Sequence, residues 1–238
     1  MNWTNDCAAV IPCLNEAATI GAVVTAVRRH LPRVFLVDDG SSDATGALAK
    51  QAGAEVLRHD HARGKGAALQ TGWHEARRRG FRWAMTLDGD GQHSPDDIPG
   101  FLERADQTGA SLVVGNRMAN PGTMPRLRRW VNRWMSGRIS RATGCALPDT
   151  QSGFRLMNLD EWAALPTTTA HFEVESEILH AFARAGRRIE FVPIQVIYGT
   201  ERSKIHPLRD TVRWFRWWRQ ARKALGRRRT GAGPGSDY

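Results

Sequence analysis

The sequence predicts an α/β fold built on a mostly parallel sheet. Apolar, β-branched runs alternate along the chain with segments in which apolar residues recur at helical spacing. Glycines follow several of the helical segments, where a helix ends most readily. This alternation is typical of a parallel sheet with helices on both faces. In such sheets ligands bind beyond the carboxyl ends of the strands.

The predicted elements follow in order along the chain. Buried strands are predicted at residues 7–12, 34–39, 54–59, 82–88 and 111–116. Helices are predicted at residues 16–31, 44–53, 64–80 and 94–109. Gly53, Gly80 and Gly109 end three of these helices. Ser94 and Pro95 favour the start of the fourth helix, as an N-cap residue followed by proline.

Charge is distributed unevenly over the 238 residues, whose formal net charge is +10. Residues 201–230 contribute a net +9, so the body is nearly neutral and the tail strongly basic. A basic tail favours an anionic partner, either a membrane surface or a nucleic acid, although a solvated, loosely ordered end has the same composition. The length predicts one large domain, or one domain with an appendage.

The cysteines and the apolar segments indicate the cellular compartment in which the protein is expected. Cys7, Cys13 and Cys145 are odd in number and match no metal or redox spacing, which favours a reduced cytosolic chain. The first residues lack the pattern of a signal peptide. No apolar stretch approaches the roughly 20 residues that span a bilayer.

Acidic and amide side chains follow one predicted strand after another, most densely in "TLDGDGQHSPDD" (86–97). An exposed turn is also rich in Asp and Gly. However, two carboxylates at positions i and i+2 beyond a strand can face one divalent cation, and Gln92 can add an amide oxygen. Oxygen ligands suit Mg²⁺ or Mn²⁺, which proteins commonly share with substrate phosphates. The segment "HARGKGAAL" does not meet the P-loop pattern, and His59-x-His61 is interpreted as a polar loop.

Several motifs occur in one order: "VIPCLNE", "VDDGSSDAT", "GKGAALQTGW", "TLDGDGQHSPDDIP", "VVGNRM", "DTQSGFRLM" and "FEVESEIL". Over residues 7–205 this order resembles family 2 glycosyltransferases, most closely the dolichyl- or polyprenyl-phosphate sugar synthases. The resemblance implies a GT-A fold, with a nucleotide-sugar half at 1–117 and an acceptor half at 118–206. It also implies a UDP- or GDP-linked sugar donor and a divalent metal, Mg²⁺ or Mn²⁺.

The resemblance also implies roles for individual residues. The implied nucleotide pocket contains Pro12, Asn15, Glu16, Asp38, Asp39, Lys65, Gly66 and Asp88. The implied metal and diphosphate site consists of Asp88, Asp90 and Gln92. Arg117 is implied near the reacting phosphate, unless it is a surface arginine at a strand end. A cation and an arginine there would stabilise the departing nucleotide diphosphate, which makes Asp90 and Arg117 catalytic candidates.

The acceptor determines whether a base is needed. A hydroxyl acceptor needs a general base, for which Asp149 and Glu175 are the candidates, whereas an ionised phosphate needs none. Ser152 and Arg155, in "SGFR", are implied on the acceptor side, although a simple strand and turn would contain the same residues. Glu173, Glu175 and Glu177 cannot share one helix face, so at least one of them is expected to be solvated.

Two segments combine arginines with bulky apolar residues. In residues 126–141, Leu127, Trp130, Val131, Trp134 and Met135 are placed on one side of a helix, with Arg126, Arg129 and Arg133 largely opposite. This pattern favours an interfacial helix in which Arg129 and Arg133 bind a lipid phosphate, or else a core-packed helix with a wet arginine face. Residues 207–226 are a predicted basic amphipathic helix for an anionic membrane surface, and 227–238 a disordered tail. Arg202 and Lys204, in the loop before it, are implied to close over donor phosphates.

These observations together predict a metal-dependent, inverting glycosyltransferase. We expect transfer to a polyprenyl phosphate at the inner, cytoplasmic face of the membrane, with peripheral attachment. Many members of the resembled family carry transmembrane helices after the catalytic domain, and none is predicted here. The alternatives are a hydroxyl acceptor on a glycan or lipid, a nucleotidyltransferase, which is disfavoured because no "GxGTR"-type loop follows the first strand, and a basic nucleic-acid-binding module. Nucleic acid is the less favoured partner, since no recognised nucleic-acid fold accompanies the basic tail.

Overall fold

A computed structural model describes residues 1–122, 124–167, 173–197 and 213–219. The chain divides into two units, at Met1–Glu201 and Arg202–Tyr238. The described strands of the first unit are β1 (Cys7–Cys13), β2 (Val34–Asp38), β3 (Glu55–Arg58), β4 (Trp83–Thr86), β5 (Leu112–Asn116), β6 (Arg155–Asn158) and β7 (Ile189–Pro193). Its described helices are α1 (Trp3–Asp6), α2 (Ile20–Arg28), α3 (Thr45–Gln51), α4 (Lys65–Arg78), α5 (Ile98–Thr108), α6 (Arg126–Thr143), α7 (Leu159–Ala163) and α8 (Val174–Arg184).

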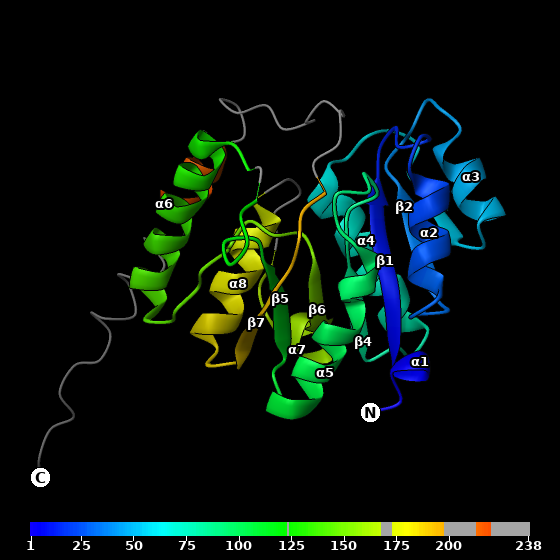
Figure 1. The fold of residues 1–238 in the computed structure, drawn as a ribbon. Helices are drawn as coiled ribbons and strands as arrows, with labels where there is room; N and C mark the ends of the chain where they lie inside the picture. The colour runs from blue at the N-terminus through cyan, green and yellow to red at the C-terminus, as the bar shows by residue number, and fades with distance from the viewer. Residues whose placement is uncertain (123, 168–172, 198–212, 220–238) are drawn as a thin grey trace, which may run out of the picture. The chain divides into compact units, whose positions relative to one another are not determined.

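The described strands form one sheet in the order β3-β2-β1-β4-β6-β5-β7 (Figure 1). All described pairings are parallel except those of β6, which runs antiparallel to both β4 and β5. The prediction of a mostly parallel α/β sheet is therefore confirmed. The five predicted strands are present within a few residues of their expected bounds, and β6 and β7 were not assigned as strands beforehand.

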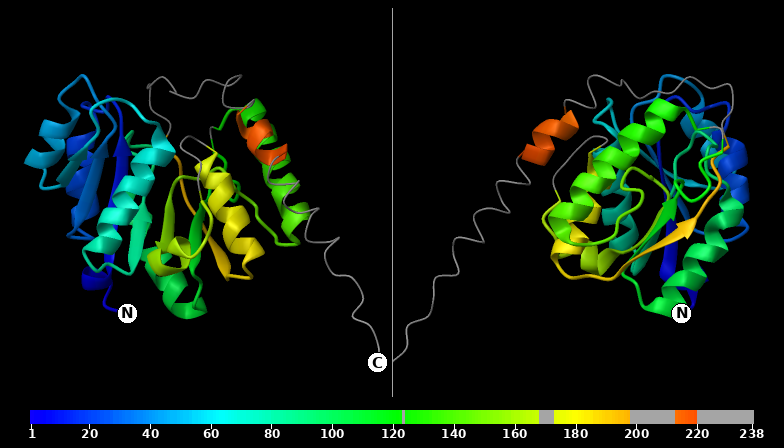
Figure 2. Two further views of the ribbon diagram at one scale, coloured as in Figure 1. Left: turned by 180° about the vertical axis from the view of Figure 1, so that it is seen from behind. Right: turned by 60° about the vertical axis from the view of Figure 1, so that its left-hand side comes forward.

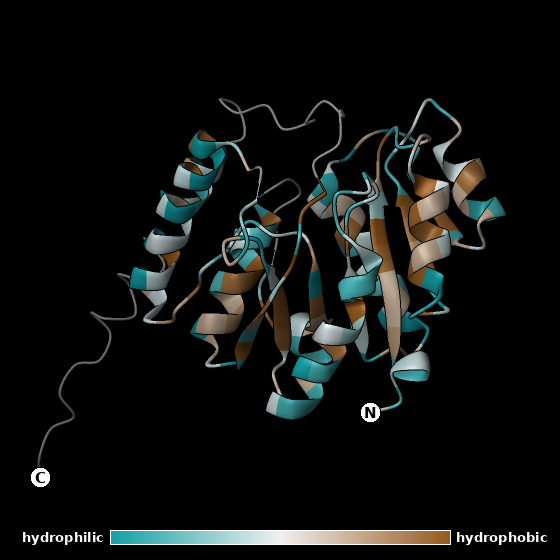
Figure 3. Cartoon of the chain, in the orientation of Figure 1, coloured by the Kyte–Doolittle hydropathy of each residue, from teal (hydrophilic) through white to brown (hydrophobic). Residues whose placement is uncertain are grey.

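Helices cover both faces of the sheet, with α2, α3 and α5 on one side and α4, α7 and α8 on the other (Figures 1 and 2). Beneath the first group, alternate residues of β1 such as Ala9 and Ile11 pack with Ile20, Val24 and Phe101 in the main hydrophobic core. The strands are the brown centre of the molecule in Figure 3, because central strands of a covered sheet are apolar on both faces.

The helix boundaries differ from the predictions mainly at their beginnings. Helix α2 starts at Ile20 and not at residue 16, because the preceding loop is bound to residues 41–45. Before α5, Pro95–Asp97 form a short 3₁₀ turn that follows Ser94, although the Ser94 side chain makes no capping bond. Gly109 does end α5 in the left-handed conformation, as predicted, with φ of 66°.

The second unit is described only at residues 213–219, which are helical. Within this segment the rings of Trp214 and Trp218 stack, with centroids 5.7 Å apart and planes inclined by 11°. The rest of the predicted helix at 207–226, and the tail at 227–238, lie outside the described residues. Among the helices that are described, none has the length and apolar character needed to cross a bilayer.

Candidate active site

The predicted functional residues gather at the carboxyl edge of the sheet. Strands β1, β2 and β4 are parallel neighbours, so the loops after Cys13, Asp38 and Thr86 leave the sheet on the same side. In Figure 1 this is the upper edge, because β1 runs upward from α1. The structure therefore brings together the loops that contain Asn15, Asp39 and Asp88.

The loop after β1 is fastened to the loop after β2. Asn15 has a positive φ of 54°, and its side-chain Oδ1 accepts a hydrogen bond of 2.8 Å from the backbone N–H of Ser42. The backbone N–H of Glu16 donates to Thr45 Oγ1 at 2.8 Å. Pro12 lies inside β1 and is buried. These bonds build one wall of the site and leave Glu16 half-buried.

Asp38, which the resemblance places in the nucleotide pocket, lies in the interior of the protein. Its side chain is completely buried, with one oxygen accepting from Ser41 N at 2.8 Å and the other from Arg58 Nη1 at 2.7 Å. A buried carboxylate with both oxygens occupied holds its own loop. A direct contact between Asp38 and a base or ribose does not fit this burial.

Asp39 organises the start of α4. Its Oδ2 accepts from Gly64 N at 2.8 Å, and its Oδ1 accepts from Arg63 N at 2.9 Å and lies 2.7 Å from His59 Nδ1. Gly64 has a φ of 101°, which only glycine adopts without strain. The next residues, Lys65 and the buried Gly66, begin α4 at the same edge of the sheet. His59 is thus part of the scaffold and not merely a polar loop residue.

The acidic motif lies beyond β4, between the loops just described. Asp90 Oδ1 accepts from Gln92 N at 3.0 Å, and Thr19 Oγ1 donates to the carbonyl of Gly89 at 2.7 Å. Burial, and then the neighbouring charge of Asp88, raise the pKa of Asp90. Burial also pushes the pKa of Asp88 upward, but Lys65, His93 and Arg117 together outweigh burial and lower the pKa.

The acidic pair fits a divalent cation shared with a ligand. Asp88 and Asp90 are both half-buried, and the charge of Asp88 raises the pKa of Asp90. A cation between the two carboxylates would offset this repulsion. Gln92 adds an amide oxygen, and an all-oxygen donor set suits Mg²⁺ or Mn²⁺. In the described part of the chain no three His, Cys, Asp or Glu side chains form a metal cage. A cation held by this pair would share its remaining coordination with oxygens of a bound ligand.

Lys65 links the acidic motif to the start of α8. Its Nζ lies 2.7 Å from Asp88 Oδ1 and 2.8 Å from Glu175 Oε1. Burial lowers the pKa of Lys65, but the charges of Asp88 and Glu175 together have the larger effect. The net pKa of Lys65 is raised, so the ammonium stays protonated. Gly153 lies directly against this contact, because a Cβ there would be 2.9 Å from Asp88 Oδ2 and 3.0 Å from Lys65 Nζ.

Arg117, after β5, forms a buried ion pair with Asp149. Its Nε donates to Asp149 Oδ2 at 2.8 Å and its Nη2 donates to Oδ1 at 2.9 Å. Asp149 also accepts from Asn132 Nδ2 and from the backbone of Arg117 and Gln151. Burial raises the pKa of Asp149, but the charge of Arg117 and the hydrogen bonds from Arg117 and Asn132 together outweigh burial, and the pKa falls to about 2. A carboxylate with these partners is a poor general base.

Arg155 binds the main chain of the segment before β6 and of the start of α8. Arg155 is buried, and its nitrogens donate to the carbonyls of Ser152, Glu175 and Thr150 at 2.7, 2.7 and 3.3 Å. Burial lowers the pKa of Arg155 to about 10. The predicted phosphate contact of Arg155 does not fit these bonds, which hold main chain in place. Ser152 is also buried, and its Oγ has no hydrogen-bond partner among the described residues.

The glutamates of the "FEVESEIL" segment are less exposed than predicted. Glu175 is 5% exposed and Glu177 is 8% exposed, and Glu173 is half-buried. Glu175 and Glu177 are therefore not simply solvated, and Glu173 is the partly exposed glutamate of the three. Nearly every side chain from Val174 to Phe182 is buried, and α8 packs against both α6 and β7.

Helix α6 has its faces arranged differently from the prediction. Its buried side holds Asn132, Met135, Ser136 and Ile139. Leu127 and Trp130 are exposed, by 73% and 63%. The predicted single apolar face is therefore wrong: Met135 packs inward while Leu127 and Trp130 lie on the outside.

The arginines of α6 lie mainly on its outer surface. Arg126, Arg133 and Arg141 are exposed, and Arg129 is half-buried, which mixes positive charge with the exposed apolar rings. Figure 3 shows α6 mostly in teal and white. The buried side instead faces the site, where Asn132 and Ser136 bind Asp149 and Thr150.

His93 and the chain after β7 were missed by the sequence interpretation. The His93 ring stacks on Phe154 at 5.2 Å, and its Nδ1 accepts from Asp88 N at 3.4 Å. Val196 bridges to His93, and Ile197 N donates to Gln92 O at 2.9 Å. The chain therefore leaves β7 along the acidic motif. Arg202 and Lys204, further along, lie outside the described residues.

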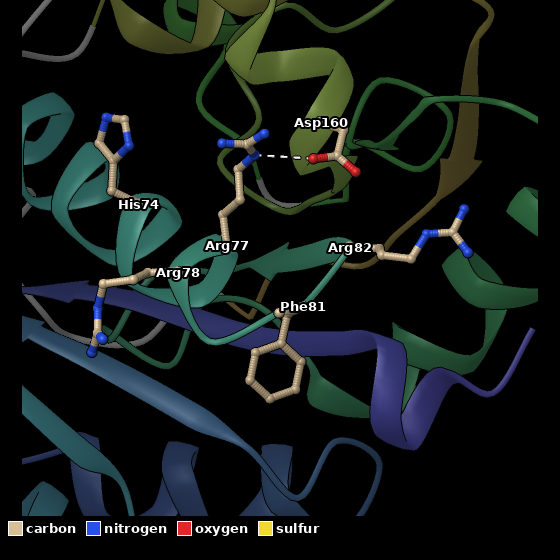
Figure 4. A pocket seen from close by; sticks show the side chains of 7 residues that line it. His74, Arg77, Arg78, Phe81, Arg82 and Asp160 are labelled. Carbon is tan, nitrogen blue, oxygen red and sulfur yellow. Dashed lines mark hydrogen bonds and ion pairs between the residues drawn. The ribbon is translucent and has the colours of Figure 1, made fainter.

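A surface hollow lies at the opposite, amino-terminal end of β4 (Figure 4). Its lining includes His74, Arg77, Arg82 and Asp160, and Arg77 Nε is 3.0 Å from Asp160 Oδ1. None of the predicted site residues lines it, so the candidate active site remains at the carboxyl edge.

The mostly parallel sheet, with an acidic pair and a buried arginine gathered at its carboxyl edge, is that of a glycosyltransferase with the GT-A fold. Residues 8–160 match the model of "Glycosyl transferase family 2". The chain belongs to this family.

Two relatives are similar over most of their length. The UDP-N-acetylglucosamine–dolichyl-phosphate N-acetylglucosaminyltransferase of Methanococcus voltae is 30% identical, covering 79% of this chain and 84% of that protein. The undecaprenyl-phosphate mannosyltransferase of Micrococcus luteus is also 30% identical, covering 79% and 82%. The fold is shared with glucosyl-3-phosphoglycerate synthase of Mycobacterium tuberculosis, solved with Mn²⁺, UDP and phosphoglyceric acid. That match has a TM-score of 0.69 and 22% identity, and covers 97% of this chain and 80% of that one.

Proposed function

We propose that the protein transfers a sugar, with inversion, from a UDP- or GDP-linked donor to a polyprenyl phosphate. The relatives above are named for dolichyl-phosphate and undecaprenyl-phosphate acceptors, and a structural neighbour was solved with UDP and Mn²⁺. The observation that carries the proposal is in the acceptor half: both carboxylates that could act as a base, Asp149 and Glu175, are bound to cationic side chains.

The donor side would use the carboxyl edge of the sheet. Asn15, Glu16 and the loop held by Asp39 form the nucleotide pocket in this proposal. Asp88, Asp90 and Gln92 would hold Mg²⁺ or Mn²⁺, which supplies positive charge to the diphosphate. Lys65 stands at the first position of α4, where the helix N-terminus also favours a phosphate. Arg117 would stabilise the leaving diphosphate, and Asp149 would keep its guanidinium in position.

The acceptor side would bind an anion without deprotonating it. A phosphate monoester is ionised at neutral pH, so its oxygen can attack the sugar directly, and a single displacement inverts the anomeric centre. A hydroxyl acceptor would require a free base. In this proposal Ser152 Oγ, which is buried and has no hydrogen-bond partner among the described residues, donates to such a phosphate. Arg155 would act indirectly, by holding the carbonyls around Ser152 and Glu175.

The outer face of α6 supports a membrane-bound acceptor. Exposed Leu127 and Trp130 can enter the headgroup layer, while Arg126 and Arg133 attract anionic lipid. Arg129, together with Arg202 and Lys204 of the undescribed segment, would supply further positive charge to phosphates. We assign residues 207–226 the same role of holding an anionic membrane, so the protein would act peripherally at the cytoplasmic face.

A donor panel tests the function directly. UDP- and GDP-sugars are incubated with the full chain and Mn²⁺ or Mg²⁺, with or without a short polyprenyl phosphate, and nucleotide release is measured. We expect release that depends on the lipid phosphate and on the metal. Transfer to a simple glycan hydroxyl, with no response to the lipid phosphate, would contradict the proposal.

The hydroxyl alternative is tested by Glu175→Gln. If Glu175 only holds Lys65, the variant loses roughly tenfold in turnover and keeps the pH profile of the wild type. A general base contributes typically about 10²–10⁴-fold, and its loss removes the acidic limb of the profile. That outcome would favour the hydroxyl acceptor.

A further inference from the structure

The ammonium of Lys65 occupies the position of a counter-ion to the acidic motif. It lies within 2.8 Å of two carboxylates from different parts of the chain, Asp88 after β4 and Glu175 at the start of α8. All three side chains are largely shielded from water, with exposures of 15% for Lys65, 26% for Asp88 and 6% for Glu175. In such surroundings the two carboxylates would be costly without a cation.

Asp88 therefore has two possible cationic partners. It is bound to Lys65 in this structure, and it is also one of the two carboxylates of the proposed metal site. The ammonium and a divalent cation repel each other at this separation, so each opposes the binding of the other to Asp88. Glu175 is not part of the acidic pair and can keep its contact with Lys65 in either case.

The surroundings restrict where Lys65 can move. Gly153 closes one side, because even a methyl group there would contact both Asp88 and the ammonium. On the other side its stem leaves the first residue of α4, next to the backbone N–H groups that a helix start directs toward an anion. A diphosphate bound at that helix start would lie within reach of an ammonium released from Asp88.

We propose that Lys65 is an exchangeable counter-ion. Before the donor binds, it neutralises Asp88 and Glu175; when the donor arrives with its cation, Asp88 turns to the cation, and Lys65, still held by Glu175, turns to the diphosphate. This inference rests on the proposed function for its donor. It explains how one site remains electrically balanced both with and without a charged ligand, and it makes metal binding and nucleotide binding cooperative.

The exchange is tested by the variant Lys65→Met with two binding measurements on the full chain. Mn²⁺ affinity is measured by electron paramagnetic resonance, first with no nucleotide and then with saturating UDP or GDP. For the variant we expect Mn²⁺ alone to bind at least about fivefold more tightly, because a repelling charge is gone. We expect the ratio of the two Mn²⁺ affinities, which measures the coupling, to fall by at least about tenfold.

Three results would overturn the exchange. Unchanged binding of Mn²⁺ alone would show that Lys65 does not oppose the cation at Asp88. Tighter Mn²⁺ binding with an unchanged coupling ratio would show that Lys65 stays on Asp88 when the nucleotide is bound. A wild-type chain that binds Mn²⁺ but neither nucleotide would contradict the proposed donor, and with it the transfer of Lys65 to the diphosphate.

Two further variants serve as controls. Lys50→Met removes the same side chain from the exposed end of α3, and we expect both measurements to match the wild type. Lys65→Arg keeps the charge, so Mn²⁺ alone should bind as weakly as it does to the wild type. If Lys65→Arg instead behaved like Lys65→Met, the effect would be one of shape and the charge exchange would be rejected. Circular dichroism confirms that each variant is folded.

Discussion

Arg117 and Asp149 form a buried, bidentate ion pair, with Arg117 Nε 2.8 Å from Asp149 Oδ2 and Arg117 Nη2 2.9 Å from Asp149 Oδ1. Asp149 is fully buried and Arg117 is 7% exposed. The pair joins the end of β5 to the loop before β6, and α6 reaches it through Asn132. The guanidinium to which we assign the leaving diphosphate is thereby held at the carboxyl edge of the sheet.

The first prediction concerns the variant Asp149→Asn. It leaves the charge of Arg117 buried without its partner, so we expect the free energy of unfolding to fall by roughly 3 kcal/mol. Urea denaturation measures this loss. Turnover should fall as well, with a larger effect on kcat than on the KM of the donor. A variant of wild-type stability would show that the pair contributes little.

Asp90→Asn should separate catalysis from stability. Burial and the charge of Asp88 raise the pKa of Asp90, so removing its charge relieves repulsion in the empty site. We therefore expect unchanged or slightly increased thermal stability, with turnover lowered by at least about a hundredfold and weakened Mn²⁺ binding. Asp96→Asn, at an exposed position nearby, is the control. Normal turnover by a folded Asp90→Asn protein would remove Asp90 from the metal site.

Gly153→Ala should weaken binding at the site because the added methyl group clashes with Asp88 and Lys65. The added Cβ would come within 2.9 Å of Asp88 Oδ2 and 3.0 Å of Lys65 Nζ, so these groups must shift. We expect Mn²⁺ and nucleotide binding to weaken by at least about tenfold, since a catalytic site depends on positions held within a fraction of an ångström. Gly137→Ala in α6, which meets nothing within 4 Å, should bind normally and gain about 0.5–1 kcal/mol in stability. Equal behaviour of the two variants would contradict the prediction.

The double variant Leu127→Ser/Trp130→Ser tests the outer face of α6. Both side chains are exposed in the structure, so their removal should leave the unfolding free energy within about 0.5 kcal/mol of the wild type. Sedimentation with vesicles containing anionic lipid should show binding weakened by roughly tenfold or more, because the buried apolar area is lost. Vesicles of neutral lipid provide the baseline. Unaltered binding to anionic vesicles would exclude this face as a membrane contact.

His180 should make the protein less stable in acid. Burial, and then the charge of Arg184, lower its pKa from 6.5 to about 4, so the folded protein favours the neutral ring. The stabilising contribution is complete above pH 6.5 and is lost as the pH falls through about 4. We expect the variant His180→Gln to lose less stability over this interval, by on the order of 1–2 kcal/mol. If the free energy of unfolding of the two proteins fell equally with pH, protonation of His180 would not account for the loss of stability in acid.

The sequence alone determined the order of the first strands and helices, because hydrophobic periodicity and helix-ending glycines are local properties. It also placed Asp88, Asp90 and Arg117 at strand ends, and in a parallel sheet those ends share one edge. Strands β6 and β7 were harder to assign, since a short strand in a mixed sheet has no periodicity that separates it from a loop.

Only the tertiary structure decided what each polar side chain does. The motifs implied ligand contacts for Asp38 and Arg155 and made Asp149 a candidate base, yet the bonds of all three hold other parts of the chain. Lys65 and Glu175 are 110 positions apart, and no local pattern reports that they meet. The physical reason is that burial and ionic partners depend on contacts between segments that are distant in the sequence. The chemistry of a residue and its place on a strand or helix depend instead on its near neighbours in the sequence.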